Sequence, residues 1–373
     1  MRDGEISFPY PLLYLRELRC RRMKKICRAG ILVAVVIVFA GLVCMQYRDQ
    51  NPQRYEGQFF DCFDTVTMIT GYADSQQDFS EKLELLQAKL VYYHQLYDIY
   101  HTYDGVNNLK TINDNAGVEA VKVDAEIFDL LKFGKEMYDK TEGRLHIAYG
   151  SVLSLWHEYR EEGLRNPLQA KLPPQAELEA RAAHIDIEKV ILDEQSSTVY
   201  LADAQMSLDV GSIGKGYAVQ KLAAYAREIG LKHALISVGG NVCAVGERAD
   251  GTPWRVGIEN PTLDSEKPYL AAVGLSDGCL VTSGDYQRYY EVDGERYCHI
   301  IDPETNMPPQ YFASVSVQAE DSGVADALST SLFNMEYAQG VSLVDNMEGV
   351  EAMWVGKDGE IRYSSGFKVY EEK

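Results

Sequence analysis

The apolar residues of this 373-residue chain follow several different spacings, and each spacing predicts a different element. Residues 29–45 form one uncharged apolar run, close to the length that a helix needs to cross the hydrocarbon core of a membrane. The segment 58–72 is rich in Phe, Thr, Val and Ile, which predicts a strand. From residue 79 to residue 100 the apolar positions recur every three or four residues, which predicts a long amphipathic helix.

The rest of the chain alternates helical and β-branched segments. Asp124 is placed to cap a helix that runs to about Lys140, and paired prolines open a third helix within 173–184. Further apolar patterns predict helices over 214–229 and 323–345. Short β-branched runs predict strands over 190–192, 234–238, 255–258 and 313–317. We therefore expect an α+β protein in which one compact body mixes α and β structure.

Basic residues between positions 16 and 28 precede the apolar run. By the positive-inside rule they predict a cytoplasmic N-terminus and an extracytoplasmic body, and thus a protein held at the cell membrane by a single N-terminal anchor. The predicted parts are a cytoplasmic basic segment over 1–28, a transmembrane anchor or signal over 29–47, a linker over 48–57 and the body over 58–373.

The start and the processing of this N-terminal region have alternatives. Met23 is followed by two lysines and resembles the start of an export signal, so it is a second candidate for the first residue. Cys44 allows a lipoprotein interpretation, but Leu42 and Val43 are bulkier than lipidation signals require. An uncleaved anchor is the favoured interpretation.

The body is strongly acidic. Residues 1–48 hold nine of the 36 Lys and Arg residues and three of the 56 Asp and Glu residues, so the remainder carries 27 basic and 53 acidic residues, a net charge of −26. This charge argues against nucleic acid as a partner. It also repels a phosphate ligand unless a cation or backbone amides bind the phosphate locally.

The cysteines of the body do not form a metal motif, because no CxxC pair is present. An exported chain could oxidise four cysteines in any of three pairings, and single buried thiols within strand-like runs are the simpler interpretation. The four are Cys62, Cys243, Cys279 and Cys298.

A glycine-rich segment, LDVGSIGKGYAV at 208–219, predicts a strand end, a turn and a helix start. This geometry aims backbone amides at a phosphate, and Lys215 adds a positive charge. The segment lacks the Ser or Thr that follows the lysine of a Walker loop and does not match GxGxxG, so a turn that only packs a strand on a helix explains it equally well. Farther along, Gly239 and Gly240 separate two apolar runs and predict a hairpin.

Two later segments carry candidate chemistry. His299 and Asp302 lie at the edge of a predicted strand that stops at Pro303, although a histidine beside a strand is more often structural than catalytic. Asp326 and Thr330 are four residues apart on a predicted helix and therefore face the same side. Their oxygen atoms suit magnesium, although acidic residues are also favoured near helix N-termini for electrostatic reasons alone.

Taken together, five segments resemble the FAD:protein FMN transferases of the ApbE type. The resemblance spans residues 58 to about 360. It implies a single T-fold-like α+β body with a flavin cleft, Mg²⁺ as the required ion, and transfer of FMN from FAD to a Thr or Ser hydroxyl of an exported acceptor protein, with release of AMP. A membrane redox subunit that carries covalent FMN is the acceptor class that it implies. The segments, in order, are DVGSIGKGYAV, ISVGGN, WRVGIENP, TSGDYQRYYEVDGERYCHIIDPETNMP and SVSVQAEDSGVADALSTSLF.

The resemblance also implies roles for individual residues. Mg²⁺ would be bound by the backbone carbonyl of Ser212 and by the side chains of Asp326 and Thr330. His299 and Asp302 are the candidates for the base that accepts the proton of the acceptor hydroxyl. The residues that would contact FAD are Phe63, Thr65, Tyr103, Arg144, Leu145, His146, Asp209, Lys215, His299 and Ile301.

The chain departs from the family pattern at three places. The residues 144–146, Arg-Leu-His, stand where the family usually has an apolar residue, Phe and Asp after a glycine. Asn306 replaces a turn glycine, a mild change because Asn tolerates a left-handed backbone, and Phe63 replaces a common methionine. Two alternative functions are an FAD pyrophosphatase, in which water is the acceptor, and a non-catalytic flavin-binding protein, against which Asp326 and Thr330 argue.

Overall fold

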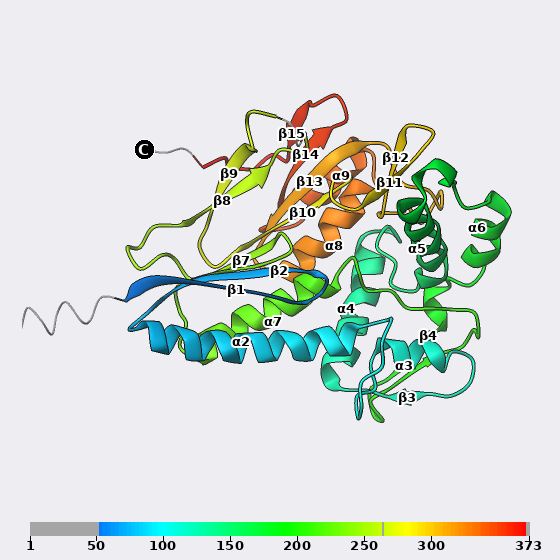
Figure 1. Cartoon of the computed structure of the whole chain (residues 1–373), viewed down its shortest axis with the longest axis horizontal. Helices are drawn as coiled ribbons and strands as arrows, with labels where there is room; N and C mark the ends of the chain where they lie inside the picture. Colours follow the sequence, from blue (N-terminus) through cyan, green and yellow to red (C-terminus); the bar gives the residue numbers. More distant parts are fainter. Residues whose placement is uncertain (1–51, 263–264, 371–373) are drawn as a thin grey trace, which may run out of the picture. The chain divides into compact units, whose positions relative to one another are not determined.

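The computed structural model describes residues 52–262 and 265–370, and its elements are labelled in Figure 1. The predicted cytoplasmic segment, the predicted anchor over 29–47, Met23 and Cys44 lie outside these described residues. Within the described ranges, no helix is both long and apolar enough to cross a membrane.

An eight-stranded sheet forms the centre of the body. From β2 onward, the paired neighbours in this sheet run antiparallel. In spatial order the strands are β1 (Gln53–Cys62), β2 (Thr65–Ala73), β6 (Ala234–Val238), β7 (Asn241–Val245), β10 (Cys279–Gly284), β13 (Phe312–Ala319), β14 (Glu351–Gly356) and β15 (Ile361–Tyr363).

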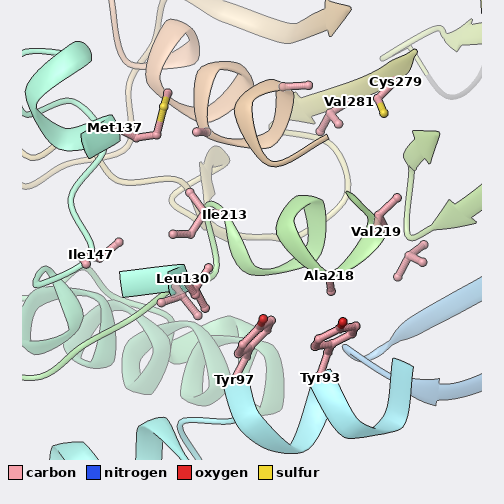
Figure 2. Close-up of a cluster of buried hydrophobic side chains, with 14 of the residues drawn as sticks. Tyr93, Tyr97, Leu130, Met137, Ile147, Ile213, Ala218, Val219, Cys279 and Val281 are labelled. Atoms are coloured by element: carbon pink, nitrogen blue, oxygen red, sulfur yellow. The ribbon is translucent and has the colours of Figure 1, made fainter. Parts of the chain in front are cut away.

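Three helices pack against one face of this sheet: α2 (Gln76–Tyr97), α7 (Gly214–Glu228) and α8 (Ser322–Phe333). Figure 2 shows Tyr93 and Tyr97 of α2 reaching toward Ala218 of α7, and these side chains belong to the largest buried cluster. This packing explains the three- and four-residue spacing of apolar residues along α2.

A hairpin covers part of the opposite face. Strands β8 (Trp254–Glu259) and β9 (Tyr269–Leu275) pair with each other and bury Ala244, Leu280 and Met353 of the central sheet. Alternate residues of one strand therefore enter different cores, since Leu280 faces this hairpin while its neighbour Val281 faces the helices.

Smaller elements complete the body. Figure 1 shows α5 and α6 beside β11 and β12, and these four elements share a third apolar cluster. The remaining elements are α3 (Leu109–Asp114), β3 (Val121–Lys122), α4 (Ala125–Lys140), α5 (Gly150–Arg165), η1 (Pro167–Gln169), α6 (Gln175–Ala182), η2 (Ile187–Lys189), β4 (Val190–Asp193), β5 (Thr198–Leu201), β11 (Tyr289–Val292), β12 (Glu295–Cys298) and α9 (Tyr337–Asp345).

The expectation of mixed α and β structure is confirmed, and several element boundaries match the sequence analysis. The side chain of Asp124 accepts a hydrogen bond from the amide of Glu126 (3.0 Å), and α4 then runs to Lys140. Helix α7 begins at Gly214, and Gly239 and Gly240 both have positive φ in the turn between β6 and β7. These features depend on residues only a few positions apart.

Three boundary predictions are wrong. The segment 58–72 is not one strand, because Phe63 and Asp64 (φ 54° and 51°) turn the chain between β1 and β2 without the glycine or asparagine that marks such turns. Strand β1 begins at Gln53, within the predicted linker 48–57. The predicted helix 323–345 is two helices, α8 and α9, interrupted over 334–336.

The cysteines also differ from the simpler interpretation. Cys243 and Cys279 form a disulfide between β7 and β10, where they are directly opposed in the strand register. Two strands that are 36 residues apart in the chain are adjacent in the sheet, which the sequence pattern did not reveal. Cys298 is a buried thiol, as expected.

Candidate active site

A cavity of about 320 Å³ is lined by residues from α5, α7, α8, the turn between β1 and β2, and the segment after β12. Most of the predicted site residues line it. They are Phe63, Arg144, Leu145, His146, Asp209, Ser212, Lys215, His299, Ile301 and Thr330. Thr65, Tyr103, Asp302 and Asp326 do not line it.

The glycine turn is fixed from both sides. The segment before it is not a strand of a sheet, contrary to expectation, but the amide of Asp209 still donates to the carbonyl of Ile147 (2.9 Å). The amide of Gly211 donates to the Asp209 carboxylate (2.7 Å), and Ile213 is buried in the cluster that Figure 2 shows. These anchors leave Lys215, in the first turn of α7, on the cavity wall.

Helices α7 and α8 approach each other closely at the turn. The amide of Gly216 donates to Oδ2 of Asp326 (2.7 Å). A Cβ atom on Gly216 would collide with the carbonyl oxygen of Ser322 and with Cβ of Asp326, so only glycine permits this approach. Thr330, one helical turn after Asp326, reaches the cavity together with Ser212. The glycine-rich segment and the segment with Asp326 and Thr330, each weak evidence for a site when taken alone, therefore lie together at the cavity.

The electrostatics of this site favour a cation. Asp326 is buried, and its desolvation raises the pKa of the carboxyl, an effect only partly opposed by Lys215, the Gly216 amide and Asn241. Burial likewise raises the pKa of Asp209. Carboxylate, hydroxyl and carbonyl oxygens are the donors that Mg²⁺ prefers, so the residues present fit that ion. No group of three or more Asp, Glu, His or Cys side chains suited to a metal occurs in the described part of the chain, so an ion here would also require Thr330 and backbone oxygen.

His299 directly follows β12 and is fixed by its backbone and its ring. Its amide donates to the carbonyl of Arg288 (3.0 Å), and its Nδ1 lies 3.2 Å from the same oxygen. His299 is exposed at the cavity wall, and neighbouring protein atoms still displace part of the water around its ring. This desolvation, with the charges of Lys215, Arg288 and Arg160, lowers the pKa of His299 to about 3. The ring is therefore neutral at physiological pH.

Asp302 lies beside the cavity wall with its carboxylate engaged. Oδ1 accepts from Arg144 (3.1 Å), and the same guanidinium also donates to the carbonyl of Asn334 (3.1 Å) and pairs with Glu304 (2.7 Å). Arg144 thus connects the residues after α4, the turn after His299 and the end of α8. Asp302 holds this junction, and His299 is the candidate base with the more open access.

Comparison with known proteins agrees with this architecture. The model of the ApbE family matches residues 63–354. The chain belongs to the ApbE family. It is 30% identical to the FAD:protein FMN transferase of Vibrio cholerae over 309 residues, covering 81% of this chain and 87% of that protein. It is 34% identical to the FAD:protein FMN transferase of Treponema pallidum over 272 residues, covering 69% and 73% respectively.

A solved structure gives the same result for the fold. The ApbE protein of Thermotoga maritima superposes with a TM-score of 0.73 at 29% sequence identity, covering 84% of this chain and 97% of that structure. The resemblance inferred from the five sequence segments, and the ApbE-like fold that it implied, are thereby confirmed.

This ApbE-family chain accommodates its departures from the family pattern by local contacts. Asn306 has the left-handed backbone (φ 58°) expected of the glycine that it replaces. Its side chain adds a contact that glycine lacks, because Oδ1 accepts from the hydroxyl of Tyr149 (2.6 Å). His146 packs edge-on against Tyr138, and burial lowers the pKa of His146 to about 4, so it lines the cavity as a neutral ring.

Two predicted FAD contacts lie behind the cavity wall. The hydroxyl of Tyr103 donates to Asp98 (2.7 Å), and it is Asp98, with Tyr100, that lines the cavity. Thr65 starts β2 and packs against Gly239 in the turn between β6 and β7. Both residues support cavity segments in this structure.

Sequence reasoning missed several cations and aromatic residues of the cavity. Helix α5 was not predicted, although Val152, Leu155 and Trp156 have helical spacing and are buried. This helix places His157 and Arg160 on the cavity wall. Arg288, the residue immediately before β11, also lines the cavity.

Proposed function

We propose that this chain transfers FMN from FAD to a Thr or Ser hydroxyl of an exported protein and releases AMP, with Mg²⁺ as the required ion. The observation that carries the proposal is the hydrogen bond between Asp326 and Gly216, which holds this carboxylate against the glycine turn whose Ser212 and Lys215 line the cavity. The FAD:protein FMN transferases of Vibrio cholerae and Treponema pallidum, which this chain resembles over most of its described length, support the reaction class.

The proposed metal ligands are Asp326, Thr330 and the carbonyl of Ser212. Mg²⁺ would neutralise charge that develops on the phosphoryl oxygens of FAD. Lys215 supplies a second positive charge from the first turn of α7, and the fixed glycine turn holds both groups without rearrangement. In a strongly acidic body, this local arrangement is what makes an anionic dinucleotide bindable.

The transfer step requires a base and an oxygen nucleophile. The acceptor hydroxyl oxygen forms a bond to the phosphorus of the FMN half, the bond from that phosphorus to the bridging oxygen breaks, and AMP leaves with that oxygen. The hydroxyl proton passes to the base, for which His299 is the first candidate, since it is neutral and open to the cavity. The phosphates of bound FAD oppose the surrounding cations and raise the basicity of this ring.

The flavin ring is proposed to lie against the predicted contact residues. Phe63, Leu145, His146 and Ile301 provide apolar and aromatic surface on the cavity wall, which suits an isoalloxazine ring. Asp209 lines the cavity immediately before the glycine turn, where its carboxylate accepts a hydrogen bond from the amide of Gly211.

The location and the acceptor belong to the same proposal. Residues 29–47 would anchor the chain in the cell membrane with the body outside the cytoplasm, and a membrane redox subunit that carries covalent FMN would be the acceptor. Protease treatment of intact cells and of lysed spheroplasts tests the orientation. Degradation of the body only after lysis of the cytoplasmic membrane would contradict it.

One assay tests the reaction. The detergent-solubilised full-length chain is incubated with FAD, Mg²⁺ and a Thr-containing acceptor domain, and both protein mass and free nucleotides are measured. We expect the acceptor to gain one FMN with loss of water and an equal amount of AMP to appear. Free FMN with unmodified acceptor would indicate an FAD pyrophosphatase, and unchanged FAD would indicate a non-catalytic flavin-binding protein.

A further inference from the structure

The cavity carries a group of cations beyond Lys215. Arg160 projects from α5, and Arg288 precedes β11, so the two come from elements far apart in the sequence. Both guanidinium groups and Lys215 lie close enough to His299 to act on its charge. Three positive side chains therefore lie around His299 in the cavity of a strongly acidic protein.

Asp64 and Asp209 also line the cavity, and Asp209 lies close enough to Lys215 for their charges to interact. Among the described residues, neither Lys215 nor Arg288 forms an ion pair with a carboxylate, and Arg160 only approaches Glu161 at 3.8 Å. Arg288 donates instead to the backbone carbonyl of Asp64 (3.4 Å), and Arg160 lies 2.9 Å from Nδ1 of His157. The Arg160 side chain is 19% exposed and Arg288 is an exposed residue, so both arginines retain N–H donors for an anion.

An aromatic pair adjoins the two arginines. The rings of Tyr100 and His157 lie 5.5 Å apart with an interplanar angle of 37°, and both residues line the cavity. Tyr100 is 55% exposed, and Arg160, Arg288 and Asp209 lie close enough to its hydroxyl for their charges to act on it. An exposed aromatic face beside two guanidinium groups suits a nucleobase joined to a phosphate.

We infer that Arg160 and Arg288 bind the phosphate that leaves with AMP, and that Tyr100 and His157 receive its adenine ring. The inference rests on the proposed function and adds residues to it. It separates the cavity into two anion subsites: the Asp326, Thr330 and Lys215 side for the transferred phosphoryl group, and the arginine side for the leaving group. Charge on the bridging oxygen, which increases as AMP departs, would be stabilised by Arg160 and Arg288.

Binding of AMP in the presence of EDTA tests the inference. AMP carries the leaving phosphate, and EDTA removes Mg²⁺, so any phosphate binding that remains is due to protein side chains. Titrations with AMP and with riboflavin are compared for the full-length chain and its R160Q and R288Q variants. We expect each substitution to weaken AMP binding about 10- to 100-fold, since each removes charge-assisted hydrogen bonds. Riboflavin, which has no phosphate, should bind all variants equally.

Arg165 supplies the matched control. It lies exposed near the end of α5, off the cavity wall, so R165Q makes the same charge change on the same helix and should alter AMP affinity by less than about twofold. Y100A should lower the affinity for AMP several-fold but leave that for ribose 5-phosphate unchanged. If R160Q or R288Q fails to fold, as judged by its thermal midpoint, R160K or R288K replaces it and should give a smaller loss in the same direction.

The outcomes separate this inference from the proposed function. AMP binding that needs Mg²⁺, or that R160Q and R288Q leave unchanged while FMN transfer proceeds in the wild type, overturns the inference alone. Loss of affinity for the acceptor domain but not for AMP would mean that the arginines dock the acceptor, which also overturns it. A wild-type chain that binds neither FAD nor AMP would contradict both the inference and the proposed function.

Discussion

The carboxylate of Asp326 accepts a 2.7 Å hydrogen bond from the amide of Gly216, although 110 residues separate them. This contact joins the start of α7 to α8 and brings the glycine turn, Lys215 and Thr330 to the same cavity.

Replacing Asp326 by Asn should abolish Mg²⁺-dependent transfer while preserving the fold. The amide oxygen of Asn can still accept from Gly216, but it lacks the charge that a cation requires, so FMN transfer should fall roughly 100-fold or more.

T330V should reduce transfer and T330S should not, because only serine keeps the hydroxyl ligand. Transfer assays over a Mg²⁺ series measure this, and D326N with normal Mg²⁺ dependence would refute the metal role.

Gly216→Ala should separate α7 from α8. The added Cβ meets backbone and side-chain atoms of Ser322 and Asp326, and such overpacking costs about 1–3 kcal/mol of unfolding free energy. Gly278→Ala is the control, since its nearest neighbour would lie at an ordinary 3.6 Å and the cost should stay within about 0.5 kcal/mol. Urea denaturation measures both, and equal stability of the two variants would contradict the close approach.

Arg144 and Asp302 should behave as a coupled pair. R144M leaves the buried Asp302 carboxylate without its guanidinium partner and should destabilise the protein by about 3–5 kcal/mol. In the R144M/D302N double variant the loss should be less than the sum of the single losses by about 0.5–3 kcal/mol. K110M, which breaks an exposed pair with Asp114, is the control and should cost less than about 1 kcal/mol. Additive losses would show that the pair is not coupled.

His146 should make stability depend on pH. Burial lowers the pKa of His146 to about 4 in the folded state, whereas the unfolded chain has the ordinary value near 6.5. The contribution is therefore fully present above pH 6.5, and about 2 kcal/mol is lost as the pH falls from 6.5 to 4, because the unfolded state binds the proton first. Unfolding measured across this range should give a flatter curve for H146Q than for the wild type. Parallel curves for H146Q and the wild type would contradict this contribution of His146.

The disulfide between Cys243 and Cys279 should be detectable in protein purified without reductant. Alkylation of the unfolded chain should label these two cysteines only after reduction, as seen by peptide mass. Reduction should lower the unfolding free energy by about 2–4 kcal/mol, since the bond constrains the unfolded chain. A C243A/C279A variant whose stability does not respond to reductant provides the control. Full labelling before reduction would show that the pair is not oxidised.

Local features of the fold could be predicted from the sequence because their causes lie within a few residues. Asp124 caps α4 through a hydrogen bond two residues away, and the turn between β6 and β7 requires positive φ at Gly239 and Gly240. Helix α7 begins where the glycine turn ends. The membership of the ApbE family was also recoverable, because its motifs are local stretches of sequence in a fixed order.

Tertiary structure alone decided how these pieces meet. The sequence placed Asp326 on a helix and Gly216 in a turn, but their contact follows from the packing of α7 on α8 and from the order of strands beneath them. Arg144 donates a hydrogen bond to Asp302, which lies 158 residues later in the chain. Arg160 lines the cavity from α5, a helix that was not predicted from the sequence. A hydrogen bond or an ion pair between distant residues has no periodic signature along the chain, because it depends on packing that many other side chains determine together.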